Sequence, residues 1–288
     1  MATTKLPPDG LDLLTPDVTT DAEIEQFRAF YSYAKKAQNK SYEFWLEFRP
    51  DVLKRHKART ATYYVGPPAP CGALAALHQY IITAFDDGIG YEFQLAQTMG
   101  ASRSDIIDTI SVAFIHSGHP GMYLVSRHTD WLRDFEEMTP SGAFPDNWGF
   151  DPHAFDSGMD WTEMHCSEED IARLLGWYEQ TIGEVPRYVA WLAENRPDLL
   201  KAYRNRYEHA IRDSLPAQMM PYLNLHYNVF RGFEEGIREN VLLGRALGMT
   251  RQQILNAICS AVLHTGAEGF GIVERCTEGL LETFPDVD

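Results

Sequence analysis

The sequence is short of cysteine, of positive charge and of long apolar runs, and each shortage excludes a class of protein. Four cysteines in 288 residues, with no C-x-x-C pair, are too sparse for a disulfide scaffold. No run of about 18 apolar residues occurs, so we expect no membrane span. Lys and Arg number 25 against 41 Asp and Glu, and the net charge of -16 argues against nucleic-acid and membrane partners.

A basic stretch followed by an apolar run is also missing from the N-terminus. Residues 1–21 are instead rich in Pro, Thr and Asp, which predicts a poorly ordered arm and no export signal. Without such a signal, and with so few cysteines, we expect a cytoplasmic protein.

The sequence does contain an internal repeat. The segment Phe85-Asp86-Asp87-Gly88-Ile89 is matched 148 positions later by Phe233-Glu234-Glu235-Gly236-Ile237. Upstream, 49–51 and 196–198 both read Arg-Pro-Asp, at an offset of 147. Identities at the offset of 148 are Leu77/Leu225, His78/His226, Gly100/Gly248, Ile106/Ile254, Ala113/Ala261, His116/His264 and Gly118/Gly266. So many identities in one register indicate a tandem duplication.

Each copy has the pattern of helices. Apolar residues at helical spacing over 88–99 predict a helix that Asp86 and Asp87 cap and Gly100 ends. The next helix of each copy begins with a capping box, Ser102 with Asp105 and Thr250 with Gln253. Strand-like alternation is scarce, so we predict an all-α fold.

A long irregular segment, 138–166, separates the copies. It interleaves Pro, Gly and Asp with aromatic residues, and a loop of this length is uncommon unless it is functional or packed over something. We consider two compatible interpretations, a connector anchored by its aromatics and a lid or pocket wall. The predicted division is an arm (1–21), a first unit (22–137), the connector (138–166) and a second unit (167–288).

The segment 88–125 resembles the core of the carboxymuconolactone decarboxylase / alkylhydroperoxidase-D (AhpD-like) family. The matching pieces are Ala96, Gly100, Ser102, Asp105 and Ser117-Gly118-His119-Pro120, and the second copy keeps Gly248, Thr250 and Gly266 but has Glu268 in place of the proline. The resemblance covers about 40 residues in each half. It implies two tandem AhpD-like helical units packed as one pseudo-symmetric chain, and a homo-oligomer, a dimer or trimer of such chains.

The peroxidase branch of this family carries C-x-x-C-x-x-x-H at the start of the first of these helices. The corresponding positions here hold Phe85, Gly88 and Glu92 in the first unit, and Phe233, Gly236 and Asn240 in the second. A dithiol peroxidase needs an attacking and a resolving thiol. We therefore expect a protein that is not a thiol peroxidase.

The decarboxylase branch implies proton transfer without a metal or an organic cofactor, on a small oxygenated organic acid or lactone. Such chemistry needs an acid–base group tuned towards neutrality and hydrogen-bond donors around it. The candidate catalytic residues are His116, His78 and Glu92. The candidate substrate-binding residues are Asp86, Asp87, His119, Arg127, His226, Asn240 and His264.

Two alternatives stay open. The protein could be a non-catalytic helical binding or assembly protein, since each histidine alone is as compatible with a structural role. It could also be a metal-dependent enzyme that uses a set such as His78, Glu92 and His116, although no H-x-x-H spacing occurs. The sequence thus predicts a cofactor-independent lyase or isomerase with a small-molecule substrate, and no metal.

Overall fold

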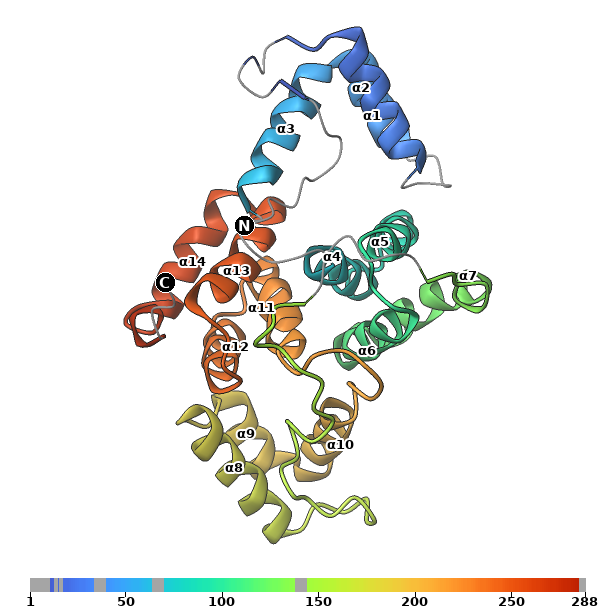
Figure 1. Ribbon diagram of the computed structural model, residues 1–288. Helices are drawn as coiled ribbons and strands as arrows, with labels where there is room; N and C mark the ends of the chain where they lie inside the picture. Colours follow the sequence, from blue (N-terminus) through green and yellow to red (C-terminus); the bar gives the residue numbers. More distant parts are fainter. Residues whose placement is uncertain are drawn as a thin grey trace.

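The computed structural model describes residues 11–12, 15, 18–33, 40–63, 70–137 and 144–284. These residues form helices with no strand among them, as the sequence predicts (Figure 1). The first half contains α1 (Asp21–Tyr33), α2 (Lys40–Phe48), α3 (Pro50–Tyr63), α4 (Cys71–Ile82), α5 (Asp86–Thr98), α6 (Arg103–Ser126) and α7 (Thr129–Arg133). The second half contains α8 (Glu168–Ile182), α9 (Arg187–Asn195), α10 (Pro197–Glu208), α11 (Met219–Arg231), α12 (Glu234–Ala246), α13 (Arg251–Thr265), α14 (Ala267–Thr277) and the 3-10 turn Leu281–Thr283. The predicted N-terminal arm lies largely outside the described residues.

Helices α4 and α11 lie against each other at the centre of the molecule. The α4 sequence is apolar almost all round, which suits a helix with neighbours on every side. It packs against α5, α6 and α11, and α11 packs against α12, α13 and α14. Leu77 and Leu225, which the repeat pairs, are both fully buried there. Helices α1–α3 and α8–α10 lie at opposite ends of this central layer (Figure 1).

Local features recur between the halves. The capping boxes at Ser102 and Thr250 are both present, which confirms those two predictions. Gly118 kinks α6 with φ 58° and ψ -159°, and Gly266 separates α13 from α14 with φ 65° and ψ -152°. Only glycine takes this conformation without strain. A duplicated unit predicts such recurrence, and the duplication remains a prediction.

The prediction that Asp86 and Asp87 cap the helix expected over 88–99 is wrong. Phe85 is the N-cap residue of α5 and makes no side-chain cap bond, while Asp86 and Asp87 lie in the first turn. Helix α12 begins in the same way, at Phe233. The acidic residues there favour the helix through its dipole rather than by capping it.

Asp108 on α6 ties the first half to the segment between α10 and α11. Its carboxylate is 2% exposed and accepts the backbone N–H groups of residues 212–215, at 3.2 Å to Oδ1 and at 3.0–3.1 Å to Oδ2. A carboxylate bound by several N–H groups is a strong, charge-assisted anchor. This anchor fixes the turn that leads from α10 into the central layer.

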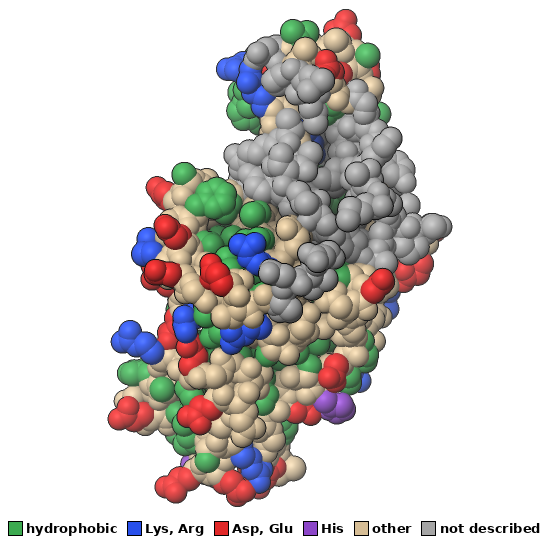
Figure 2. All heavy atoms as spheres, turned by 60° about the vertical axis from the view of Figure 1, so that its left-hand side comes forward, with side chains coloured by type: hydrophobic (Ala, Val, Ile, Leu, Met, Phe, Trp, Pro, Cys, Tyr) green, Lys and Arg blue, Asp and Glu red, His purple; other side chains and the backbone are tan. Residues whose placement is uncertain are grey.

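On the face drawn in Figure 2, acidic and basic side chains are interspersed, and the acidic residues form no single patch. No helix among the described residues is long and apolar enough to cross a membrane.

Candidate active site

A cavity of about 590 Å³ opens in the second half of the chain, next to α6 of the first half. Helices α9 to α12 form most of it, and α6 contributes His116 from the first half. The lining is mostly polar or aromatic: His116, Tyr188, Leu192, Tyr203, Tyr207, Asn224, Tyr227, Asn228, Arg231, Gly232, Phe233, Glu239 and Asn240. The volume lies within the range of small-molecule sites.

Two glycines shape the wall at the junction of α11 and α12. Gly232 ends α11 in the left-handed region with φ 66°. A Cβ atom at Gly236 would lie 2.5 Å from Phe233 Cδ1 and 2.6 Å from Asn228 Nδ2. The absence of that atom lets the start of α12 approach the end of α11, so that Asn228, Phe233 and Asn240 face one cavity.

Glu239 supplies the only carboxyl group among the described residues that line the cavity. It is 8% exposed, and the Tyr188 hydroxyl donates to it at 2.9 Å to Oε2 and 3.2 Å to Oε1. Burial raises the pKa of Glu239 to about 7, although Tyr188 and the charge of Arg204 act in the opposite direction. A carboxyl group with this pKa can both donate and accept a proton near neutral pH.

A buried charged network lies behind Glu239. Arg204 is 1% exposed; its Nε donates to Glu208 Oε1 at 2.7 Å and its Nη2 to the Phe155 carbonyl at 2.6 Å. Its guanidinium also lies 3.9 Å from the ring centre of Trp177 and interacts with Tyr178, which in turn interacts with Glu239. The network links the carboxyl group in the cavity to the connector.

Phenol groups provide neutral donors around the same space. Burial raises the pKa of Tyr188, Tyr203 and Tyr207, so all three hydroxyls keep their protons at neutral pH. The Tyr203 and Tyr207 hydroxyls hydrogen-bond to no described residue, in contrast to that of Tyr188. They are therefore available to stabilise negative charge on a bound molecule.

His116 reaches the cavity from α6. Its ring stacks on Tyr227 at 6.1 Å and 24°, and lies 6.1 Å from the ring of Tyr203. The imidazole is exposed on the cavity side, yet protein surrounds its other sides, and this desolvation and the charge of Arg206 lower its pKa. At neutral pH it is an uncharged hydrogen-bonding group.

Only part of the set expected from the sequence converges here. His116 and Asn240 line the cavity, and Asn240 donates to the Gly236 carbonyl at 2.8 Å, which leaves its own Oδ1 buried and unbonded among the described residues. His78 and His226 lie in the core between α4 and α11, 0% and 1% exposed. Desolvation lowers the pKa of both, that of His226 to about 3. They are neutral core histidines near the cavity rather than residues that line it.

The other expected residues are spread over α5, α6 and α13. Glu92 is 5% exposed and raises the pKa of Lys57, which burial lowers. Asp86 pairs with Arg127 at 2.5 Å on the surface. Asp87, His119 and His264 are exposed and lie outside the cavity lining.

Sequence reasoning missed Glu239 and the tyrosines. One signal could have found the acid: three and four positions along the helix from Glu239 stand Leu242 and Leu243, and three positions before it stands Gly236. That spacing puts the carboxyl group on the buried face of α12. The tyrosines come from α9 and α10, outside the resemblance, and the sequence carries no signal that joins them to α12.

The cysteines and the possible metal ligands bear on thiol chemistry and on metal chemistry, respectively. All four cysteines are free, and Cys71, Cys166 and Cys276 are buried. Burial raises the pKa of each of these thiols, which disfavours a reactive thiolate. Among the described residues, no group of three or more His, Cys, Asp or Glu side chains could hold a metal ion.

Comparison with known proteins returned no relative: no protein-family model, no curated protein and no solved structure matches the chain.

Proposed function

We propose that this protein is a lyase or isomerase that acts on a small organic molecule by proton transfer, with Glu239 as the acid–base group. The observation that carries the proposal is the position of Glu239, a buried carboxyl group held by Tyr188 in the wall of an open cavity. The resemblance of the sequence to the decarboxylase family points to the same chemistry.

The roles follow from the protonation states. With its pKa near 7, Glu239 can remove a proton from a substrate carbon and return it elsewhere. The hydroxyls of Tyr203 and Tyr207 supply neutral donors for the enolate-like charge that forms. His116, uncharged, can orient the substrate by a hydrogen bond.

The substrate we propose is a small oxygenated organic acid or lactone. Arg231 lines the cavity, is exposed and makes no ion pair with a described residue, so it is available to an anionic group. This local cation offsets the net charge of -16, which otherwise repels anions. We also propose that the protein is cytoplasmic and that it forms a homo-oligomer.

Proton exchange tests the proposal without knowledge of the full reaction. The protein is incubated in D2O with pools of small hydroxy acids, keto acids and lactones, and loss of C–H signals is followed by proton NMR. We expect exchange in one pool, abolition of it by Glu239→Gln and a reduced rate with Tyr188→Phe. Glu179→Gln, on the exposed face of α8, is the matched control and should leave exchange unchanged.

Two outcomes would reject the proposal. Exchange that survives Glu239→Gln would remove Glu239 from the chemistry. The absence of exchange in every pool would leave a non-catalytic binding protein as the better description.

A further inference from the structure

A second cavity, of about 540 Å³, lies between the connector and the C-terminal end of α10. It shares no lining residue with the first cavity. The connector supplies one wall, including Asp156, Met159 and Trp161, and α10 with the turn after it supplies the other, including Glu208 and Arg212. The described part of the 138–166 segment therefore lines this cavity.

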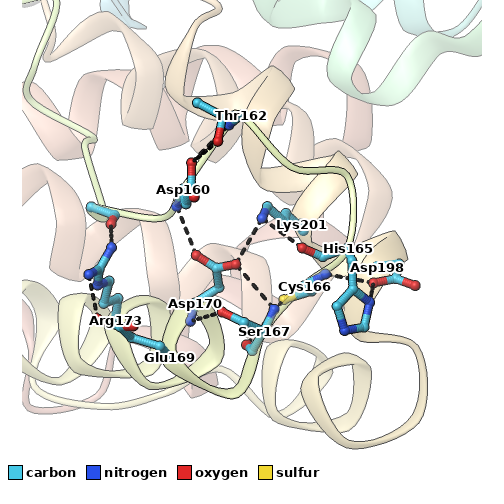
Figure 3. Close-up of polar contacts among 11 residues, drawn as sticks. Asp160, Thr162, His165, Cys166, Ser167, Glu169, Asp170, Arg173, Asp198 and Lys201 are labelled. Carbon is cyan, nitrogen blue, oxygen red and sulfur yellow. Dashed lines mark hydrogen bonds and ion pairs between the residues drawn. The ribbon is translucent and has the colours of Figure 1, made fainter.

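The connector wall is held in place by buried polar contacts. Asp170 accepts the backbone N–H of Asp160 at 2.8 Å and pairs with Lys201 at 2.8 Å, and Lys201 also donates to the His165 carbonyl at 2.8 Å (Figure 3). Arg173 donates to the Gly158 carbonyl at 2.7 Å. These contacts fix an irregular segment from both sides, so the cavity is preformed.

Glu208 carries an unmet hydrogen-bonding requirement at this cavity. Its Oε1 accepts from Arg204 Nε at 2.7 Å, from the Ser157 N–H at 3.1 Å and from the Ser157 hydroxyl. The residue is only 2% exposed, and its Oε2 is buried without a hydrogen-bond partner among the described residues. A buried acceptor without a donor is costly, and a ligand that donates a hydrogen bond would remove the cost.

The lining also carries both signs of charge. Asp156 adds a second carboxylate, with His153 at 2.8 Å from it. Arg212 is exposed and makes no ion pair with a described residue, while Asp108 fixes its backbone N–H at 3.2 Å. A ligand with a single charge would meet one favourable and one unfavourable group, whereas a zwitterion matches both.

We propose that this cavity binds an α-amino acid with an apolar or aromatic side chain. Its ammonium group donates to Glu208 and Asp156, its carboxylate pairs with Arg212, and its side chain packs on Trp161 and Met159. The indole of Trp161 is half-buried, and its ring centroid lies 5.8 Å from that of His209 in a T-shaped arrangement. The indole offers an apolar surface to such a side chain.

Calorimetric titration of the full chain with phenylalanine tests the proposal. Two analogues each remove one charge: phenylalanine amide lacks the carboxylate and phenyllactate lacks the ammonium. We expect saturable binding of phenylalanine and at least about tenfold weaker binding of both analogues. Leucine should bind and glycine should not, because glycine has no side chain for Trp161.

Variants locate the binding. Arg212→Gln should weaken phenylalanine at least about tenfold and abolish its advantage over the amide, and Asp156→Asn should weaken it while the amide and phenylalanine keep their ratio. Arg251→Gln, an exposed arginine on α13, is the matched control and should change nothing. Glu208 itself is avoided because its loss would strand the buried charge of Arg204.

The idea is overturned if no binding is seen up to about 10 mM, if the two analogues bind as well as phenylalanine, or if Arg212→Gln binds normally. Glu239→Gln should leave this binding unchanged, so the inference stands or falls separately from the proposed chemistry.

Discussion

Replacement of Asp108 by alanine should destabilise the whole chain. The carboxylate is the shared acceptor of the N–H groups of residues 212–215, at 3.0–3.2 Å, and no described cation pairs with it. The alanine variant strands these donors at a junction between the halves. Leu215 is fully buried, so water cannot replace the carboxylate at that end of the turn, while Asp213 is exposed and can be solvated.

The magnitude follows from which donors lose their partner. A hydrogen bond to a charged group contributes about 1.5–3 kcal/mol, and a buried donor left alone costs about 1–3 kcal/mol. With one donor fully stranded and the others partly solvated, we expect the free energy of unfolding to fall by about 2–4 kcal/mol. At roughly 2–4 °C per kcal/mol, the Tm should fall by about 5–15 °C.

Urea unfolding followed by circular dichroism measures this change through the midpoint at constant slope. The control is Asp130→Ala, an aspartate 88% exposed at its side chain and paired with Arg133, which should change the free energy by less than about 0.5 kcal/mol. The reasoning is refuted if the two variants shift the midpoint equally.

Three further changes test other parts of the fold. Asp170→Asn leaves buried Lys201 without its partner and should lower the free energy of unfolding by about 3–5 kcal/mol. Burial raises the pKa of Asp170, but the hydrogen bonds from Lys201 and the backbone lower this pKa overall. The difference in urea midpoint between the variant and the wild type should therefore shrink as the pH falls below about 4, where Asp170 begins to gain a proton on unfolding. Gly118→Ala should cost about 1–3 kcal/mol by calorimetry, because φ is 58° there, whereas Gly176→Ala inside α8 should stabilise by about 0.5–1 kcal/mol. Burial lowers the pKa of His226 to about 3, so the unfolded state binds a proton on this imidazole that the folded state does not. His226 alone should therefore lower the free energy of unfolding by up to about 1.4 kcal/mol for each pH unit below pH 6.5, and His226→Gln should remove that contribution from the pH slope in urea titrations between pH 4 and 6.

Local signals in the sequence predict much of the fold because they act over a few residues. The capping boxes at Ser102 and Thr250 require only side chains three positions apart, and both are present. The cap at 86–87 fails because an acidic residue is equally at home in the first turn, where the helix dipole favours it. The presence of these helices was therefore predictable, but the residue at which each one begins was not.

The candidate site was predictable only where the repeat marks it. His116 and Asn240 were expected from the sequence, and they meet in one cavity although they are more than a hundred positions apart. Tyr188 and Tyr203 approach them through the packing of α9 and α10, which no local pattern encodes. Glu239 differs from an ordinary surface acid only by the burial of its helix face, and that burial depends on the tertiary fold.

The buried ion pair of Arg204 and Glu208 lies in the last turns of α10, which separate the two cavities. Tyr207 borders the first cavity and Glu208, its neighbour in sequence, borders the second. Water is excluded from the ion pair, so its two charges are little screened. Because the charges of Arg204 and Glu208 compensate each other, a substitution that removed either one would leave an uncompensated buried charge close to both cavities.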